Sequence, residues 1–543
     1  MAIRGATERR ISDLWNRPIE WLQGQSLRVL EWFNQERWTT LLTIVAIVLA
    51  NLMVLQLLLQ GQDNRAIAFV IFTLLAPLLW LIPEISIAVF LISGSSLLVN
   101  SIYFAAGPGG GTGERTFNTF LMMLITARAI YEYLRTPAGE RPRIFSWFTI
   151  ILTLFWLFYM GHVAYIYLFR YNVPPVDDIE AMLGGFRPGI FRYYDSHMFW
   201  IAVLPLIFLL RDLSRAKRVL MVVGTVLFLG VATLVMEYFT PLPMVWKIVF
   251  QIRGSGQSTE GYRVANAAIV PLMVFGFFVA LYSLGYLRRG YNLLALVYLG
   301  LALFGVILTK NRALWAGVMV GIPFALFWKP PAILARQGGV LAVAAILFSV
   351  GMLHPQFNQI VVQKYSEAMQ RWERNFAYGG DPRNDPSYQA RLREKEAWDV
   401  KMSRLNNWER LFGKGLEEPY GHYLPISVKR AYAYLGSRNA YYEKISMHMP
   451  WFLRLLQIGI VGTALMALTL IGALLRSAQA FLAVNHPFTR ALLMGVGCAT
   501  VALIGQDILH TGPLASPPSL PVIFLWSIAE LTFHWQRTGQ LSE

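Results

Sequence analysis

The stretch SWFTIILTLFWLFYMGHVAYIYLF, residues 146–169, contains no Asp, Glu, Lys or Arg. A helix of about 20 apolar residues crosses the hydrocarbon layer of a bilayer, so this stretch predicts a transmembrane helix. A second run of this kind, LLTIVAIVLANLMVLQLLLQ, begins at Leu41. Over the whole chain, 56% of residues are hydrophobic and 14% are charged, which excludes a string of soluble domains. The sequence therefore predicts an all-α polytopic membrane protein.

Similar runs recur along the chain and predict about 12 to 14 transmembrane helices. With the N-terminus inside, connections such as RDLSRAKR (211–218) carry the basic residues expected on the cytoplasmic side, and both termini lie in the cytoplasm. The net charge of +16 is explained by these loops, so it does not indicate a nucleic-acid partner. Candidate spans lie near residues 41–60, 66–82, 85–106, 118–134, 146–169, 197–210, 219–236, 264–287, 293–309, 313–328, 338–353, 450–475, 491–510 and 520–535.

The long hydrophilic stretch before the last spans is expected to form a periplasmic or extracellular loop domain. Aromatic and apolar residues recur there at steps of three or four, as in KEAWDVKMSRLNNWERLFG, which predicts helices rather than disorder. We therefore divide the chain into an amphipathic cytoplasmic segment (1–40), a transmembrane bundle (41–353), a mainly helical outer loop domain (354–448) and C-terminal transmembrane helices with a cytoplasmic tail (449–543).

Basic residues on the predicted outer side depart from the positive-inside pattern. Arg253 and Arg263 lie in an outer loop, and Lys310 and Arg312 lie in the outer turn TKNRALWAG. The guanidinium group of arginine keeps its charge and donates a fork of hydrogen bonds that matches phosphate oxygens. Snorkelling or pairing with a glutamate would explain one such arginine, but the group predicts a site for a lipid-linked phosphate or diphosphate.

Two ionisable residues stand at the start of another span, in HMPWFLRLLQIGIVG (448–462). His448 can exchange a proton near neutral pH and lies on the same side as the outer arginines, which makes it a candidate for an acid–base role; alone, such a histidine would more often only cap the span. Arg454 lies deeper, where a charge normally faces a cavity or a partner rather than lipid. Asp507 and His510, one turn apart in another span, are either that partner or a second polar cluster.

Other kinds of site have little support. The motifs HExxH, CxxC, GxSxG and Walker A do not occur, and the single cysteine, Cys498, allows no disulfide framework. We expect neither a metal nor a cofactor. Asp177 and Asp178 in VPPVDDIE carry one alternative, a metal-assisted glycosyltransferase that uses a polyprenyl phosphate. The other alternative is a polysaccharide or lipid transporter, against which the large one-sided loop and the lack of a visible repeat argue.

This arrangement resembles the O-antigen ligase and O-antigen polymerase superfamily of bacterial envelope enzymes, mainly over the C-terminal two-thirds of the chain. The resemblance rests on Arg263 opening a span, on the turn TKNR ending in Arg312, and on a large outer loop. A helix of that loop carries Arg391 and runs to LFGKG, and the loop closes at His448. Ten residues separate His448 from Gly459, and Arg404 from Gly415, and the second spacing resembles an R-x10-G pattern of the polymerases.

The resemblance implies a metal-independent, inverting glycosyl transfer from an undecaprenyl-diphosphate-linked glycan to an acceptor hydroxyl. It implies that Arg263 and Arg312 hold the diphosphate, that His448 takes or orients the acceptor's proton, and that Arg391 positions the glycan. The acceptor would be a lipid A core, a lipid-linked repeat unit or another surface molecule. The expected location is the bacterial inner membrane, with the active site at its periplasmic or extracellular face.

Overall fold

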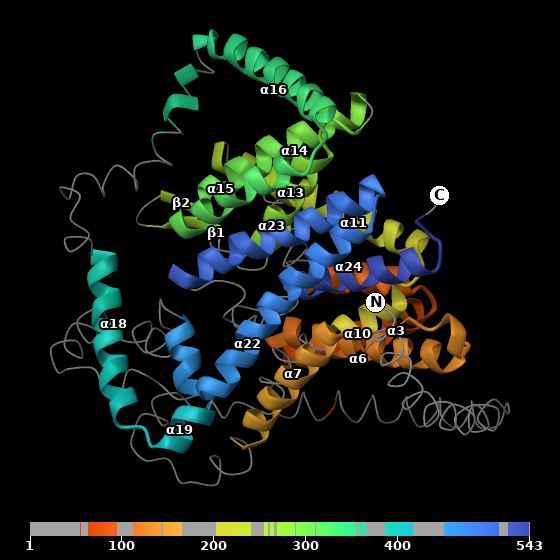
Figure 1. Ribbon diagram of the computed structural model, residues 1–543, viewed down its shortest axis with the longest axis vertical. Coiled ribbons are helices and arrows are strands. Elements are labelled where there is room, and N and C mark those ends of the chain that lie inside the picture. Colours follow the sequence, from red (N-terminus) through yellow and green to blue (C-terminus); the bar gives the residue numbers. More distant parts are fainter. Residues whose placement is uncertain are drawn as a thin grey trace.

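The computed structural model describes residues 63–94, 112–142, 145–165, 202–239, 255–258, 261–264, 269–287, 289–309, 311–355, 386–415, 450–509 and 520–541, with positions 55, 358–359, 361–363 and 366. Helices make up almost all of this part, and a short hairpin is its only sheet. The helices cross one another in a bundle, with α18 and α19 at one side of it (Figure 1). This architecture confirms the predicted all-α fold class.

The elements follow the predicted spans closely. The N-terminal part contains α3 (Asp63–Leu81), α4 (Pro83–Gly94), α6 (Thr112–Arg135), the 3-10 turn η2 (Ala138–Glu140), α7 (Trp147–Tyr165), α10 (Val203–Leu209) and α11 (Leu213–Phe239). The middle part contains β1 (Ser255–Ser258), β2 (Gly261–Val264), α13 (Ile269–Ser283), α14 (Arg289–Leu308), α15 (Arg312–Phe327) and α16 (Pro331–Met352). The last part contains α18 (Pro386–Ser403), α19 (Asn407–Phe412), α22 (Pro450–Ala483), α23 (Pro487–Leu509) and α24 (Leu520–Arg537).

Within the described residues, five helices are long and apolar enough to cross a membrane: α11, α14, α16, α22 and α23. Shorter apolar stretches occur in α3, α4, α7, α13 and α15. The polytopic membrane class is thus confirmed, while the total of about 12 to 14 spans, the sidedness and the four-part division stay predictions.

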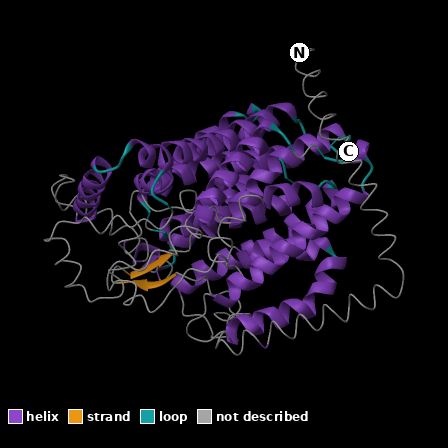
Figure 2. Ribbon diagram, turned by 90° about the horizontal axis from the view of Figure 1, so that it is seen from below, coloured by secondary structure: helices purple, strands orange, loops and turns teal. Residues whose placement is uncertain are grey.

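The centre of the bundle is formed by α13, α23 and α24. Nearly every residue of α13 is buried, and α24 buries large side chains such as Trp526 and Trp535. α13 is apolar around its whole circumference because it contacts other helices on all sides. Figure 2 shows the helices as one mass, with the strands at its margin.

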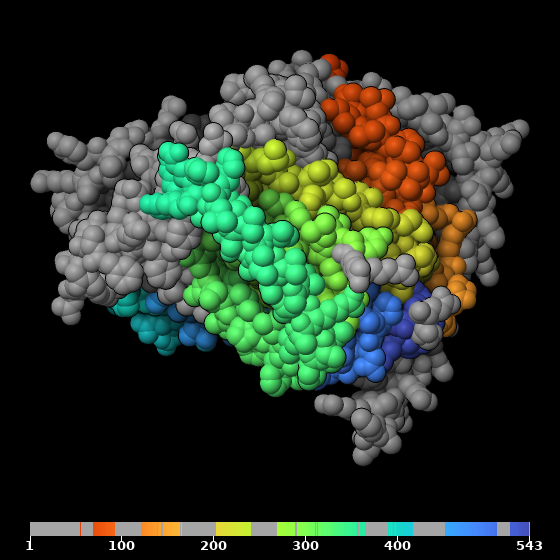
Figure 3. Space-filling model, turned by 90° about the horizontal axis from the view of Figure 1, so that it is seen from above, coloured from red at the N-terminus to blue at the C-terminus, as the bar shows by residue number. Residues whose placement is uncertain are grey.

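α16, unlike the central helices, is mostly exposed. It stands apart as a ridge on the surface in Figure 3. Its first turns are fixed by Lys329, whose Nζ donates to the carbonyls of Leu281 and Leu284, both at 2.9 Å, and to the side chain of Gln337. A cation is stabilised beside the carbonyls that end α13. Burial lowers the pKa of Lys329 to about 8, so the amine is still mostly protonated at neutral pH. Only the base of α16 is therefore held by polar contacts to α13.

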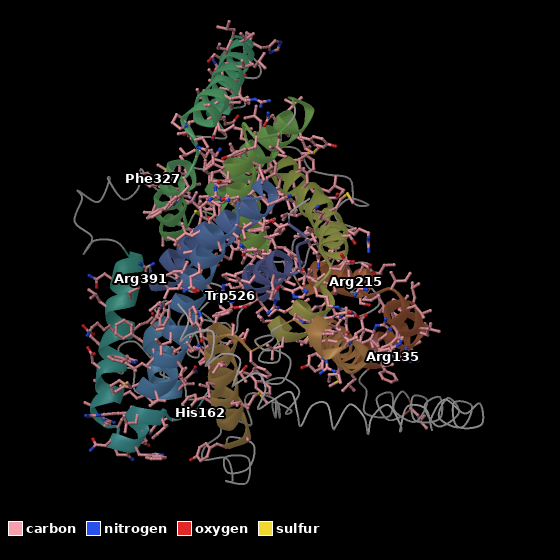
Figure 4. The ribbon with its side chains drawn as sticks, turned by 45° about the vertical axis from the view of Figure 1, so that its right-hand side comes forward. Arg135, His162, Arg215, Phe327, Arg391 and Trp526 are labelled. Carbon is pink, nitrogen blue, oxygen red and sulfur yellow. The ribbon has the colours of Figure 1, made fainter. Side chains whose placement is uncertain are left out.

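The end of the molecule opposite the loop helices carries a network of ion pairs. Glu132 is 9% exposed and lies 3.1 Å from Arg211 and 3.4 Å from Arg215. Arg218 pairs with Glu84 at 2.8 Å. Figure 4 shows Arg215 and Arg135 at this end, far from Arg391 and His162. The basic connection 211–218 is therefore tied to the bundle by buried or half-buried carboxylates.

Candidate functional site

The turn that leads into α15 fixes the backbone of Arg312. Asn311 caps the helix, because its side chain accepts from the amides of Ala313 at 3.1 Å and Leu314 at 3.2 Å. The hydroxyl of Thr309 accepts from the Asn311 amide at 3.2 Å, and both side chains are buried. Arg312 is consequently the first residue of α15, where the positive end of the helix dipole adds to its charge.

α23 packs against α15 in the opposite direction. A Cβ at Gly317 would lie 2.6 Å from the Cα of Ala502, and one at Gly505 would lie 3.6 Å from the carbonyl of Ala313. Glycines at these positions let the two helices approach closely. The end of α23, with the fully buried Asp507, therefore lies beside the start of α15.

The hairpin carries Arg263 on β2, paired with Gly256 of β1. Sequence reasoning placed Arg263 at the opening of the next span; the structure describes it on β2, and it describes α13 from Ile269. The antiparallel pairing of Gln257 with Tyr262 and of Ser258 with Gly261 makes the two strands a hairpin. β2 contacts α14, and both strands lie at the end of the bundle where α15 begins (Figure 1). Arg263 and Arg312 thus belong to the same end of the molecule.

α22 contains a break at Gly459, where the backbone adopts φ 67° and ψ −172°. The carbonyls of Leu456 and Gln457 accept from the amides of Lys414 at 3.0 Å and Gly415 at 2.9 Å. A break of this kind frees carbonyls from the helix, and in a membrane they need other donors. The segment LFGKG supplies them, so the loop that follows α19 is joined directly to the interior of α22.

Arg454 lies on α22 just before this break and is half-buried. Its guanidinium donates to the side chain of Gln457 at 3.0 Å. Arg454 also lies close enough to the buried Tyr159 of α7 to act on it electrostatically, so it faces the bundle, as expected for a charge at this depth.

The helices of the predicted outer loop contact the start of α22. The indole nitrogen of Trp398 donates to the carbonyl of Phe452 at 2.7 Å, and the two rings meet edge to face at 4.7 Å. Asn406 and Glu409 form a capping box that starts α19. Arg391 is half-buried on α18 and is labelled in Figure 4, whereas Arg404 is exposed in the turn between α18 and α19. The structure therefore brings Arg391 but not Arg404 into a packed environment.

The other predicted site residues lie outside the described residues: His448, Arg253, Lys310, Asp177, Asp178 and His510. Among the residues that are described, no three His, Cys, Asp or Glu side chains come together in a metal-binding group. Sequence reasoning missed Gln457, because it stands in the apolar stretch that predicts α22. The one available signal was that Gln457 follows Arg454 by three positions, on one face of a helix.

Residues 297–467 match a family model described as O-antigen ligase. The match runs from α14 to the middle of α22 and so includes the capped start of α15, the loop helices and the break at Gly459. It does not include α7, the hairpin or Asp507. This confirms the predicted resemblance to the O-antigen ligase and polymerase superfamily, and it rests on this segment alone. A comparison with curated proteins gives no match.

Proposed function

We propose that this chain, whose residues 297–467 match the O-antigen ligase family, is a membrane glycosyltransferase that uses a lipid-linked donor. It would move a glycan from undecaprenyl diphosphate to an acceptor hydroxyl at the outer face of the bacterial inner membrane, with inversion and without a metal. The acceptor would be a lipid A core, a lipid-linked repeat unit or another surface molecule.

The capped start of α15 is the observation that carries this proposal. Two buried polar side chains, Thr309 and Asn311, are used to hold Arg312 at the first position of an apolar helix. An arginine at a helix N-terminus suits the oxygens of a diphosphate, whose negative charge grows as the glycosyl bond breaks. Arg263, on the hairpin at the same end of the bundle, would add a second guanidinium.

The remaining roles follow from charge and proximity. His448 would accept the proton of the attacking hydroxyl, and the diphosphate would leave with the electron pair of the broken bond. Arg454 would contribute charge near the membrane boundary. Arg391, Arg253, Lys310 and Arg404 would bind phosphate or glycan oxygens.

The test is product analysis with purified protein in nanodiscs, an undecaprenyl-diphosphate oligosaccharide, EDTA and no nucleotide. We expect transfer by the wild type and loss of transfer in His448→Ala and Arg312→Ala. His354→Ala is the matched histidine control, because His354 is exposed at the end of α16. A ladder of longer lipid-linked glycans would identify a polymerase, and transfer only to an added second acceptor would identify a ligase.

Two results would overturn the proposal. One is full activity in both variants when they are folded. The other is activity only with a metal and a monophosphate-linked sugar, which would favour the alternative based on Asp177 and Asp178.

A further inference from the structure

We propose that a cluster of arginines, at the end of the bundle opposite the loop helices, binds the headgroup of an anionic phospholipid. The arginine cluster consists of Arg128, Arg135, Arg211, Arg215 and Arg218. It lies outside the family match, and its ligand is neither the donor nor the acceptor of the proposed transfer. The inference therefore goes beyond the proposed function and does not rest on it.

Two carboxylates join the arginine cluster across three helices. Glu132 on α6 lies 3.1 Å from Arg128 and 3.4 Å from Arg215 at the start of α11. Arg215 also lies 3.5 Å from Glu84 on α4. Glu84 in turn pairs with Arg218 at 2.8 Å. These charges therefore form one patch, at the end of the molecule where Figure 4 labels Arg215.

The arginine cluster carries more positive charge than the neighbouring carboxylates neutralise. Glu84 and Glu132 pair with it directly, and Asp212, which caps the start of α11, is a third carboxylate close by. Glu140 in η2 is followed by Arg141, so these two residues add no net charge. Five guanidinium groups thus stand against three carboxylates. An excess of two positive charges remains to attract an anion.

Two members of the arginine cluster are presented at the surface. Arg135 ends α6 and is exposed, and within the described part of the chain it forms no ion pair. Its guanidinium lies 4.7 Å from the ring centroid of Tyr131. The side chain of Arg218 is 55% exposed. A guanidinium has more N–H donors than these contacts use, so both arginines retain donors for phosphate oxygens.

The arginine cluster lies at the depth where lipid phosphates are found. Arg215 and Arg218 stand in the first two turns of α11, which is long and apolar enough to cross a membrane. Trp80 stands in the last turn of α3, and its ring centroid lies 5.3 Å from the guanidinium of Arg128. Tryptophan and basic side chains of this kind concentrate at the membrane–water boundary. The position therefore suits a lipid headgroup.

Exposed apolar side chains adjoin the arginine cluster on the same helices. Ile85, next to Glu84, is 37% exposed, and Leu81 at the end of α3 is 72% exposed. Met221, one turn after Arg218, is 66% exposed. Acyl chains would cover this surface, whereas a free phosphate ion would leave it bare. The excess of positive charge favours an anionic headgroup over a zwitterionic one, which brings an ammonium group of its own.

The experiment is native mass spectrometry of the full chain in detergent, titrated with phosphatidylglycerol or with phosphatidylcholine that has the same acyl chains. A basic side chain near the surface strengthens binding of an anionic lipid about fivefold, so the excess of two charges predicts about 25-fold tighter binding of phosphatidylglycerol. Arg135→Gln and Arg218→Gln should each lower this preference about fivefold. The double variant, with no excess charge, should bind the two lipids equally.

Arg336→Gln is the matched control, because Arg336 is also an exposed arginine but lies on α16, where it donates to the carbonyl of Leu287 at 3.2 Å. It should leave the preference unchanged. If Arg218→Gln does not fold, Arg135→Gln decides alone.

Three results would overturn the inference. The first is a wild type that binds both lipids equally. The second is a preference that persists in the folded variants or that Arg336→Gln lowers as much. The third is complete displacement of phosphatidylglycerol by excess inorganic phosphate, which would mean that the cluster binds a free anion. Binding is measured without a glycan donor, so failure of the proposed transfer leaves this inference standing.

Discussion

Replacing Gly459 by alanine is expected to detach the predicted outer loop from α22. The backbone there has φ 67° and ψ −172°, a region that is essentially restricted to glycine and costs other residues about 1–3 kcal/mol. A Cβ at this position would also overlap the carbonyl of Leu411 and the amide of Gly413. The segment would have to move away, and the hydrogen bonds from Lys414 and Gly415 would be lost at about 1 kcal/mol each.

Together these effects predict that the free energy for opening this junction falls by about 3–5 kcal/mol. If the wild-type junction is at least that stable, the Lys414 and Gly415 amides should exchange with deuterium at least about a hundredfold faster in Gly459→Ala. The measurement is hydrogen–deuterium exchange by mass spectrometry in nanodiscs, read on peptides that cover residues 407–415.

Gly497→Ala is the control, since this glycine lies in a membrane helix, α23, and an added Cβ there would have no atom within 4 Å. It should leave the exchange of the loop peptides unchanged. Wild-type exchange rates at Lys414 and Gly415 in a folded Gly459→Ala protein would refute the reasoning, because they would mean that the break needs no glycine.

Three further predictions concern other parts of the bundle. Asn311→Ala should lower the free energy of unfolding by about 1 kcal/mol and reduce glycan transfer. Asn311→Asp should reduce both less, because aspartate can still cap α15. Thermal unfolding measures the change in stability, and the transfer assay measures the change in activity. Gly317→Leu should abolish folded protein on size-exclusion chromatography, because the side chain would occupy the position of the Ala502 backbone. Burial and the charge of Lys217 lower the pKa of His486, so the unfolded state takes up the proton first and stability should fall as the pH drops below about 6.5. Melting temperatures across pH 5 to 8 should show a smaller slope in His486→Asn.

Hydropathy alone predicted most of the helices. The candidate span 219–236 lies within α11 (Leu213–Phe239), and 293–309 nearly coincides with α14 (Arg289–Leu308). This works because a helix in lipid must satisfy its backbone internally, so a long apolar run leaves few alternatives. The helices extend beyond the apolar runs because polar residues at their ends still form helical turns.

Features that depend on distant contacts were not predicted. The break in α22 falls inside the continuous apolar run 450–475, and its donors come from residues 414 and 415. The electrostatic interaction of Tyr159 with Arg454 likewise brings together two apolar stretches that are far apart in the chain. For the site, sequence reasoning found Arg312 and Arg454 as charges in unusual places, but it did not identify Gln457, which accepts a hydrogen bond from Arg454.

The break at Gly459 also has a consequence for how the protein is made. Residues 413–415 leave the ribosome before α22 does, and they carry the amides that bind the carbonyls of Leu456 and Gln457. Without these amides, two backbone carbonyls inside a membrane helix would lack hydrogen-bond partners, which is unfavourable where no water can replace them. A newly synthesised α22 therefore depends on a segment that was made earlier and that must already be within reach. We expect α22 to settle at its final depth in the bilayer only after that segment has docked against it.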